Sequence, residues 1–329
     1  MRRRGAALVA VAALLTACSS GGTGGEATAE QATTPALPAT PSTPRPTAVV
    51  TPTADAESAR LEALAQLAEQ KAGEMPSESP SLSSPTSLVE GPVIGADISW
   101  PQCPKGMGIP ERPTLGLPMP RDDAEYVVVG LTNGPGFTAN PCLADQVDWI
   151  RERQLQAAAY AVASWPDDAM IAEHGADGPF DATTELGTLA NTGYQQALAN
   201  VATMRAAGLD SPIVWVDVEH VRDFEWSADL EANGAVVQGA TRGYADAGYD
   251  VGVYSTPYLW REVVGDLALE LPEWRAAGQT SQEEALSRCG DDWQIQGGEA
   301  VLGQWVEGQR DLDVTCPGVT DLGEWFRQY

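Results

Sequence analysis

The chain has 329 residues and a formal net charge of -27, because 46 acidic side chains outnumber 19 basic ones. This charge excludes the basic surface that nucleic-acid binding requires, and among the basic residues only Lys71 and Lys105 are lysines. The five cysteines and two histidines occur in no CxxC or HxxxH spacing, which argues against a structural zinc site. We therefore expect no nucleic-acid partner, no bound metal and no cofactor.

Residues 1–17 have the pattern of an export signal. Arg2–Arg4 are followed by an apolar run that ends in Leu15-Thr16-Ala17-Cys18. The pattern resembles the signal peptides of bacterial lipoproteins, which are cleaved before a cysteine that is then acylated. The resemblance implies lipidation of Cys18; a plain secretory signal that happens to contain a cysteine is the alternative. Because two or more acyl chains anchor a protein stably, we expect it on the extracellular face of the cell membrane, facing the cell wall.

Residues 18–92 are dominated by Thr, Pro, Ala, Ser and Gly. Such a composition cannot bury a hydrophobic core, so it predicts a disordered linker behind the lipid anchor. A flexible coil of this length reaches roughly 45–50 Å, and proline stiffens it further. We interpret the linker as a spacer between the membrane and the cell wall.

The rest of the chain, residues 93–329, predicts an α/β fold of the TIM-like β/α barrel class, which typically needs roughly 250 residues. Apolar runs that read as strands alternate with longer helical stretches, which predicts parallel strands joined by crossover helices. The strand runs are Val93–Ile98, Tyr126–Leu131, Ala157–Val162, Pro212–Val218 and Val251–Tyr254.

Two helices are predicted directly from the sequence, at Leu186–Ala207 and at Thr280–Arg288, the second opening with a capping box that begins at Thr280. Beyond about residue 268 only short apolar runs remain, at Leu271–Arg275, Val301–Val306 and Leu312–Val314. We therefore expect the last three barrel units to have short or missing helices.

Four cysteines fall in the predicted barrel domain, and an even number in an exported domain favours two disulfides. Three pairings are possible. We favour Cys103 with Cys142 and Cys289 with Cys316, because each pair closes a local segment between neighbouring barrel units. Catalytic or redox thiols are the alternative, although no cysteine lies beside a histidine.

Acidic residues are found where predicted strands end. Trp215, Asp217 and Glu219 share one face of the fourth strand, and the alternating valines share the other. The two acids then point into the barrel at its carboxyl end, where the catalytic residues of this fold lie. Asp97 ends the first strand with inward parity, and Asp311 lies near the end of the chain. Neighbouring carboxyl groups repel, so one can keep a proton as general acid while the other stays ionised, as glycoside cleavage requires.

Several motifs together resemble glycoside hydrolase family 25, the lysozymes or muramidases with a β/α barrel. They occur in the family's order across residues 93–329. The motifs are Gly95-Ala96-Asp97-Ile98-Ser99, Trp215-Val216-Asp217-Val218-Glu219, Gly252-Val253-Tyr254-Ser255 with Trp260, and Gly303-Gln304-Trp305 followed by Asp311-Leu312-Asp313.

The resemblance implies hydrolysis of the β-1,4 bond between N-acetylmuramic acid and N-acetylglucosamine in peptidoglycan. By it, Glu219 would protonate the glycosidic oxygen and Asp217 would steer the substrate's N-acetyl group, while Asp97 and Asp311 would shape the site. Aromatic side chains at strand ends or in the following loops can supply flat faces for sugar rings, with core packing as the alternative. These residues are Trp100, Trp165, Tyr254, Trp260 and Trp305.

The chain also departs from the family. After the second strand it reads Gly130-Leu131-Thr132-Asn133-Gly134, with Asn133 at an acidic position, and Trp100-Pro101-Gln102-Cys103 follows the first strand. In these changes the chain resembles a divergent branch of secreted barrels. They keep open a catalytically inactive barrel that binds cell-wall glycan or acts as a scaffold, and a hydrolase of a different glycan. We expect a monomer whose partners are peptidoglycan or a related glycan and, through the anchor, the membrane.

Overall fold

The computed structural model describes residues 89–329 except 135 and 223. The chain divides into two units, residues 1–79 and 80–329, and every described residue belongs to the second. The predicted signal peptide, Cys18 and nearly all of the predicted linker lie outside the described residues. In the part that is described, no helix combines the length and the apolar character needed to cross a membrane.

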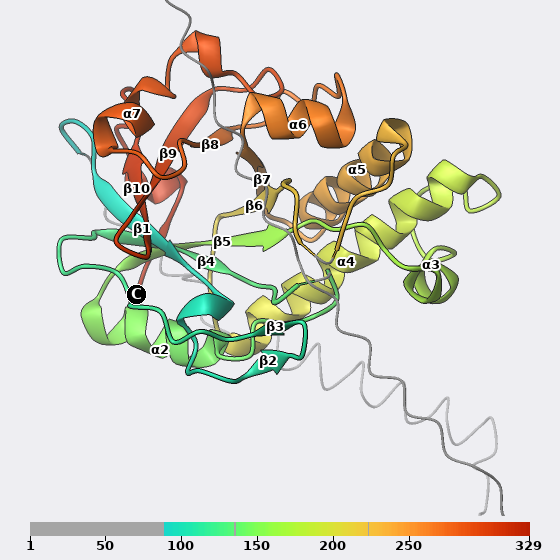
Figure 1. Cartoon of the computed structure of the whole chain (residues 1–329), viewed down its shortest axis with the longest axis horizontal. Helices are drawn as coiled ribbons and strands as arrows, with labels where there is room; N and C mark the ends of the chain where they lie inside the picture. The colour runs from blue at the N-terminus through green and yellow to red at the C-terminus, as the bar shows by residue number, and fades with distance from the viewer. Residues whose placement is uncertain (1–88, 135, 223) are drawn as a thin grey trace, which may run out of the picture. The chain divides into compact units, whose positions relative to one another are not determined.

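Eight of the described strands close into a barrel in the order β1-β4-β5-β6-β7-β8-β9-β10 (Figure 1). This confirms the predicted β/α barrel. The strands are β1 (Ile94–Ile98), β4 (Tyr126–Gly130), β5 (Gln156–Val162), β6 (Ile213–Asp217), β7 (Asp250–Ser255), β8 (Glu273–Ala276), β9 (Ala300–Glu307) and β10 (Arg310–Thr315).

Strand β10 corrects the expectation of an all-parallel barrel, because it runs antiparallel to both β9 and β1. The reason is the two-residue connection Gly308-Gln309, where both residues have positive φ angles of 59° and 67°. Two such residues form a tight hairpin turn, and a parallel crossover needs a connection of a dozen or more residues. As a result, residues at the start of β10 lie at the same barrel end as the carboxyl ends of the other strands.

The helices become short toward the end of the chain, as predicted. They are α2 (Leu143–Arg153), α3 (Asp168–His174), α4 (Glu185–Ala207), α5 (Leu230–Asp246), α6 (Pro257–Val264) and α7 (Gln282–Ser287). The connection from β9 to β10 is described throughout and is too short to contain a helix. The predicted capping box at Thr280 is off by one residue: Ser281 is the N-cap of α7, and its side chain accepts a hydrogen bond from the Glu284 backbone N–H at 3.3 Å.

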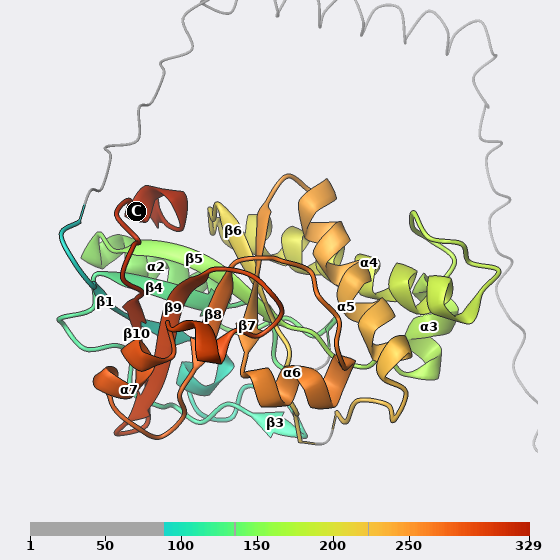
Figure 2. The ribbon, with the colours of Figure 1, turned by 90° about the horizontal axis from the view of Figure 1, so that it is seen from above.

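Helices α4 and α5 pack closely side by side and extend past the barrel toward α3 (Figures 1 and 2). Glycines permit this approach: a Cβ at Gly193 would lie 2.1 Å from the Val236 carbonyl oxygen, and one at Gly239 would lie 1.9 Å from that of Ala190. Because α4 has 23 residues, it is longer than the barrel wall that it covers.

The core has an inner and an outer layer, divided by the alternation of side chains along each strand. The β6 valines lie outside, with Val214 and Val216 in the cluster that packs under the helices. Trp215 lies inside with Tyr126 and Trp274, all at most 1% exposed. The predicted inward parity of Trp215 and Asp217 is therefore confirmed.

Smaller elements decorate the barrel. They are η1 (Trp100–Gln102), β2 (Gly108–Ile109), β3 (Arg112–Pro113), η2 (Asp291–Trp293), η3 (Leu322–Glu324) and β11 (Arg327–Gln328). Strands β2 and β3 form an antiparallel hairpin in the long β1–β4 connection, and β11 pairs with the start of β5.

Both favoured disulfides are present. Cys103 pairs with Cys142 and Cys289 pairs with Cys316, each with a Cα–Cα distance of 5.6 Å. The first joins the β1–β4 connection to the start of α2, and the second joins the segment after α7 to the end of β10. The pairing by local segments is confirmed.

Candidate active site

A pocket of about 590 Å³ opens at the carboxyl ends of the barrel strands. Its lining comes from β1, β5, β6, β7, β8, β9 and β10, and from the loops that follow β1, β6, β7 and β8. Loops at this end of a β/α barrel hold the active sites of enzymes with this fold. The pocket is therefore the candidate active site.

Among the described residues, four carboxyl groups line the pocket, from Asp97, Asp217, Glu219 and Asp311. Asp217 ends β6, and Glu219 lies two residues further on, so both side chains point to the same side. Asp97 on β1 pairs directly with Asp311 on β10, which places the two acids beside each other on one face. The structure thus brings together all four acids singled out in the sequence.

The deepest of these acids are Asp97 and Asp217, which are 6% and 4% exposed. Burial raises the pKa of both carboxyls well above the ordinary value. The nearby Asp311 and Asp313 raise the pKa of Asp97 further, against a hydrogen bond from Gln304 that lowers it. The neighbouring Glu219 carboxyl raises the pKa of Asp217.

Glu219 and Asp311 also line the pocket and are half-buried, so they are more exposed than Asp97 and Asp217. Burial raises the pKa of both carboxyls. For Glu219 the Asp311 charge adds to this effect, and the positive fields of Arg112 and His220 oppose it. Glu219 and Asp217 therefore form a repelling pair that retains a proton more readily than isolated carboxyls do.

A chain of hydrogen bonds across three strands holds Asp97 in place. The Tyr254 hydroxyl donates to the Gln304 Oε1 at 2.7 Å, and the Gln304 Nε2 donates to the Asp97 Oδ2 at 2.8 Å. Tyr254 was an expected site residue and does line the pocket. Gln304 was missed as a site residue, although its inward parity on β9 between Leu302 and Val306 was a readable signal.

Two of the expected sugar-binding aromatics do not reach the pocket. Trp305 has the opposite parity to Gln304 and packs outside the barrel, 2% exposed, in a cluster with Ala285 and Leu312. Trp260 on α6 is also 2% exposed and donates its Nε1 hydrogen to the Leu267 carbonyl at 2.8 Å. Both therefore belong to the core, which corrects the sequence-based expectation.

Other aromatic side chains do line the pocket. Trp100 lies in η1, directly after β1, and Trp274 points inward from β8. Trp165 packs beside α4 and α5 instead. Trp274 was missed because its segment, Leu271–Arg275, reads only as a short apolar run in the sequence.

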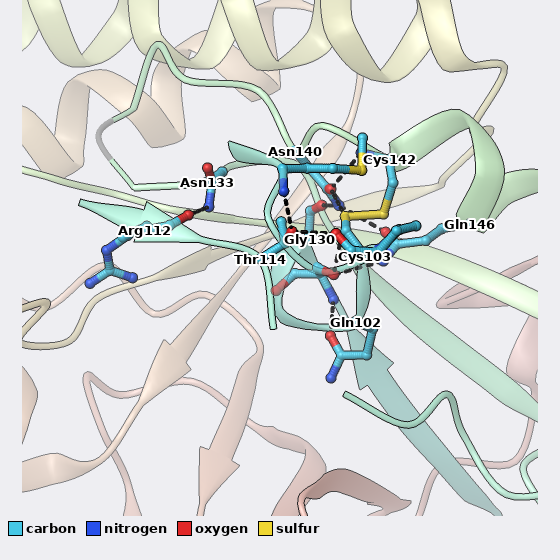
Figure 3. Close-up of a disulfide and its surroundings, with 12 residues drawn as sticks. Gln102, Cys103, Arg112, Thr114, Gly130, Asn133, Asn140, Cys142 and Gln146 are labelled. Atoms are coloured by element: carbon cyan, nitrogen blue, oxygen red, sulfur yellow. Dashed lines mark hydrogen bonds between the residues drawn. A yellow bond between two sulfur atoms is a disulfide. The ribbon is translucent and has the colours of Figure 1, made fainter. Parts of the chain in front are cut away.

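Asn133, which the sequence resemblance placed at an acidic position, lies outside the pocket and is 0% exposed. Its Oδ1 accepts a hydrogen bond from the Ile109 backbone N–H at 3.1 Å, and its Nδ2 donates to the Arg112 carbonyl oxygen at 3.2 Å. Figure 3 shows Asn133 directed at Arg112, near the Cys103–Cys142 disulfide. Asn133 thus attaches the β2–β3 hairpin to the barrel.

His220 follows Glu219 but is exposed, and its Nε2 lies 3.3 Å from the Glu262 Oε2. Among residues 89–329 without 135 and 223, no three His, Cys, Asp or Glu side chains are grouped so that they could hold a metal ion.

Comparison of the sequence with known proteins finds matches to lysozyme-like proteins. Residues 184–289 match the model of a family described as Lysozyme-like protein 1. Lysozyme-like protein 5 of Caenorhabditis elegans is 31% identical over 70 residues, which make up 21% of this chain and 31% of that relative. The chain therefore matches about a third of the length of this curated relative.

Solved structures similar to this chain include three lysozymes or muramidases. The muramidase from Trichobolus zukalii is 17% identical with a TM-score of 0.43, and the alignment covers 69% of this chain and 95% of that one. The family GH25 lysozyme from Aspergillus fumigatus is 15% identical with a TM-score of 0.42, covering 70% and 96%. The bacterial lysozyme from Streptomyces coelicolor is 15% identical with a TM-score of 0.43, covering 70% and 94%. The stretch that matches the family model contains Asp217 and Glu219, so this half of the pocket lies in a lysozyme-like segment.

Proposed function

We propose that the protein is a glycosidase of the lysozyme type that hydrolyses β-1,4 bonds of peptidoglycan, between N-acetylmuramic acid and N-acetylglucosamine. The observation that carries this proposal is the convergence of Asp97, Asp217, Glu219 and Asp311 in one pocket at the carboxyl end of the barrel. The lysozyme-like match over residues 184–289 supports the same substrate class.

Glu219 is the proposed general acid, which donates its proton to the glycosidic oxygen as the bond breaks. It lines the pocket and is half-buried, so a bound glycan chain can reach it, and burial raises the pKa of its carboxyl. A raised pKa keeps a carboxylic acid protonated closer to neutral pH, where it can act as a donor.

Asp217 is the proposed charged partner of Glu219, and the substrate decides which of the two holds the proton. Before substrate binds, burial raises the pKa of both carboxyls. An N-acetyl N–H that donates to Asp217 would stabilise its ionised form. A sugar ring that excludes water from Glu219 would favour the protonated form there. Substrate binding then moves the shared proton to Glu219.

The remaining pocket residues shape the subsites. Asp97, held by Gln304, and Asp311 present carboxyl oxygens that can accept hydrogen bonds from sugar hydroxyls. Trp100 and Trp274 offer ring faces on which apolar sugar faces can stack. Trp260 and Trp305 have no part in this proposal.

We also propose that the protein works outside the cell, anchored by a lipid on Cys18. The lipoprotein-like sequence of residues 1–18 supports this location. The two disulfides also support it, because disulfides persist in oxidising compartments. Incorporation of labelled palmitate in wild-type cells and its loss on Cys18→Ser substitution would test the anchor.

The experiment that tests the enzymatic proposal is digestion of purified peptidoglycan, followed by borohydride reduction and mass spectrometry of the fragments. Fragments that end in reduced muramic acid would support the proposed bond specificity. Ends in reduced glucosamine, or cleavage of another glycan only, would show that the substrate is wrong. Retention on the wall without any cleavage would identify the inactive, glycan-binding barrel instead.

A further inference from the structure

Arg112 is half-buried and lines the pocket together with the four acids. It comes from β3 in the long β1–β4 connection, far in sequence from the acids of β6. Its guanidinium carbon lies 5.6 Å from the ring centre of Trp100 and 5.4 Å from that of Phe224. Arg112 therefore spans from the first barrel loop to the segment that follows Glu219.

The β2–β3 hairpin that carries Arg112 is attached at several points. Asn133 binds the hairpin backbone on both sides of its turn, at Ile109 and Arg112. Thr114 accepts a hydrogen bond from the Met107 backbone N–H at 2.8 Å, and its hydroxyl donates to the Pro104 carbonyl. The Cys103–Cys142 disulfide ties the start of the same connection to α2 (Figure 3). These contacts fix where the Arg112 backbone lies.

The side chain of Arg112 reaches the segment after β6. Its Nη2 donates to the Arg222 carbonyl oxygen at 3.1 Å. Val221 and Phe224 pair across this turn, and the Trp226 Nε1 donates to the Glu219 carbonyl oxygen at 2.9 Å. Glu219 is thus the first residue of a segment that is held at one place by Trp226 and at another by Arg112.

We propose that Arg112 is a positioning residue for Glu219: it links the β2–β3 hairpin to the segment after β6 and places its guanidinium charge in the same pocket as the Glu219 carboxyl. This inference rests on the proposed function, because it assigns Arg112 a role in presenting the general acid. The planar guanidinium suits the role, since it can donate to a carbonyl and lie near aromatic rings at the same time, which a lysine ammonium cannot reproduce.

The charges around Glu219 agree with this arrangement. Asp217 at the end of β6 and Asp311 on β10 bring negative charge. Arg112 on β3 and the adjacent His220 lower the pKa of Glu219 and so oppose the effect of burial. Burial raises the pKa of the Tyr254 hydroxyl on β7, and the Glu219 charge raises it further. Arg112 keeps the Glu219 pKa from rising so far that the acid becomes a poor donor at the working pH.

The test compares Arg112→Gln and Arg112→Lys with the wild-type protein. The control is Arg222→Gln, which removes the same charge from an exposed side chain of the neighbouring segment and keeps the carbonyl that Arg112 binds. On peptidoglycan, Arg112→Gln should lower kcat between about tenfold and a hundredfold with little change in KM, as expected when a catalytic group is misplaced. The alkaline limb of its pH–activity profile should move to higher pH, because the Glu219 pKa rises when the positive charge of Arg112 is lost.

Arg112→Lys should keep the alkaline limb of the wild-type pH–activity profile, because the positive charge remains. Its kcat should fall less than that of Arg112→Gln. NMR titration of the ¹³C-labelled Glu219 carboxyl gives a second measurement that needs no activity. The Glu219 midpoint should rise in Arg112→Gln and stay in place in Arg112→Lys and Arg222→Gln. An unchanged midpoint in Arg112→Gln, or an increase in KM alone, would overturn the positioning role. A wild-type protein without activity but with the expected NMR shifts would instead refute the proposed function alone.

Discussion

Replacing Asn133 by Asp tests whether this residue is a structural amide that attaches the β2–β3 hairpin. The change is nearly isosteric, and the Oδ1 can still accept from the Ile109 N–H. The Nδ2 donor is replaced by the Oδ2 acceptor, which faces the Arg112 carbonyl oxygen at the 3.2 Å that now separates Nδ2 from it. At 0% exposure, water cannot separate the two oxygens.

The size and pH dependence of the effect follow from these contacts. A buried carbonyl that loses its donor costs about 1–3 kcal/mol, and burial of the carboxylate adds to this cost. The introduced carboxyl can avoid this cost by taking up a proton. At pH 7 that protonation costs about 4 kcal/mol relative to an unfolded pKa of about 3.9, so the loss of folding stability cannot exceed about 4 kcal/mol. The protonated acid restores a donor to the Arg112 carbonyl. Because the folded pKa lies above the unfolded one, near-wild-type stability should hold below about pH 4 and be lost as pH rises through the folded pKa.

Urea denaturation of Asn133→Asp and wild type between pH 4 and pH 8 measures this difference. Gln309→Glu, on the exposed β9–β10 turn, is the matched control for adding a negative charge to an acidic protein. We expect Asn133→Asp to lose about 2–4 kcal/mol at pH 7 and much less at pH 4, within the bounds given by the hydrogen-bond and protonation costs. A variant as stable as wild type at pH 7, or one equally destabilised at both pH values, would refute the reasoning.

Three further predictions concern the first disulfide and the interior of the barrel. Replacing Cys103 and Cys142 together by Ser should lower the free energy of unfolding by about 3.9 kcal/mol, the loop-entropy value for a separation of 39 residues, as measured by denaturation beside the reduced wild type. Gly95→Ala should lower the free energy of unfolding by at least about 3 kcal/mol, because the new Cβ would lie 2.2 Å from the Tyr126 ring. That ring cannot move away, since its centre lies 4.2 Å from that of Phe326. A soluble variant with an unchanged melting temperature would contradict this packing. Asp313→Asn keeps the oxygen that accepts from the Trp274 Nε1 and removes a carboxyl whose pKa burial raises. The variant should therefore be more stable than wild type at pH 8, and this gain in stability should shrink toward pH 4. Equal stability of the two proteins at both pH values would contradict a buried, titrating Asp313.

Much of the barrel was predictable because its strands follow simple patterns. The β6 sequence alternates valines with Trp215 and Asp217, and that alternation alone assigns the inner and outer faces. The antiparallel β10 was not predicted, because the sequence runs at Val301–Val306 and Leu312–Val314 are short and their hairpin depends on the backbone angles of Gly308 and Gln309. The local cysteine spacing was a sufficient guide to the disulfides.

The pocket was predictable to the extent that its residues lie at strand ends. Asp97, Asp217, Glu219 and Asp311 meet there because inward parity and strand order bring them together. Trp305 was misjudged because its neighbour Gln304 has the inward parity. Arg112 could not be found from local patterns, since its contact with the Arg222 carbonyl joins residues 110 positions apart. Asn133 read as a lost acid because its partners lie in a hairpin of two-residue strands, which has no clear sequence signal.

The most direct test of the central claim is the release of reducing ends from purified peptidoglycan by the wild-type protein and by Glu219→Gln, with Trp260→Phe as a control outside the pocket. We predict release by the wild type, a loss of at least roughly a hundredfold in Glu219→Gln, the scale for removing a general acid, and little change in Trp260→Phe. Comparable release by Glu219→Gln and the wild type would contradict the assignment of Glu219, and no release by any of the three proteins would contradict the enzymatic function itself.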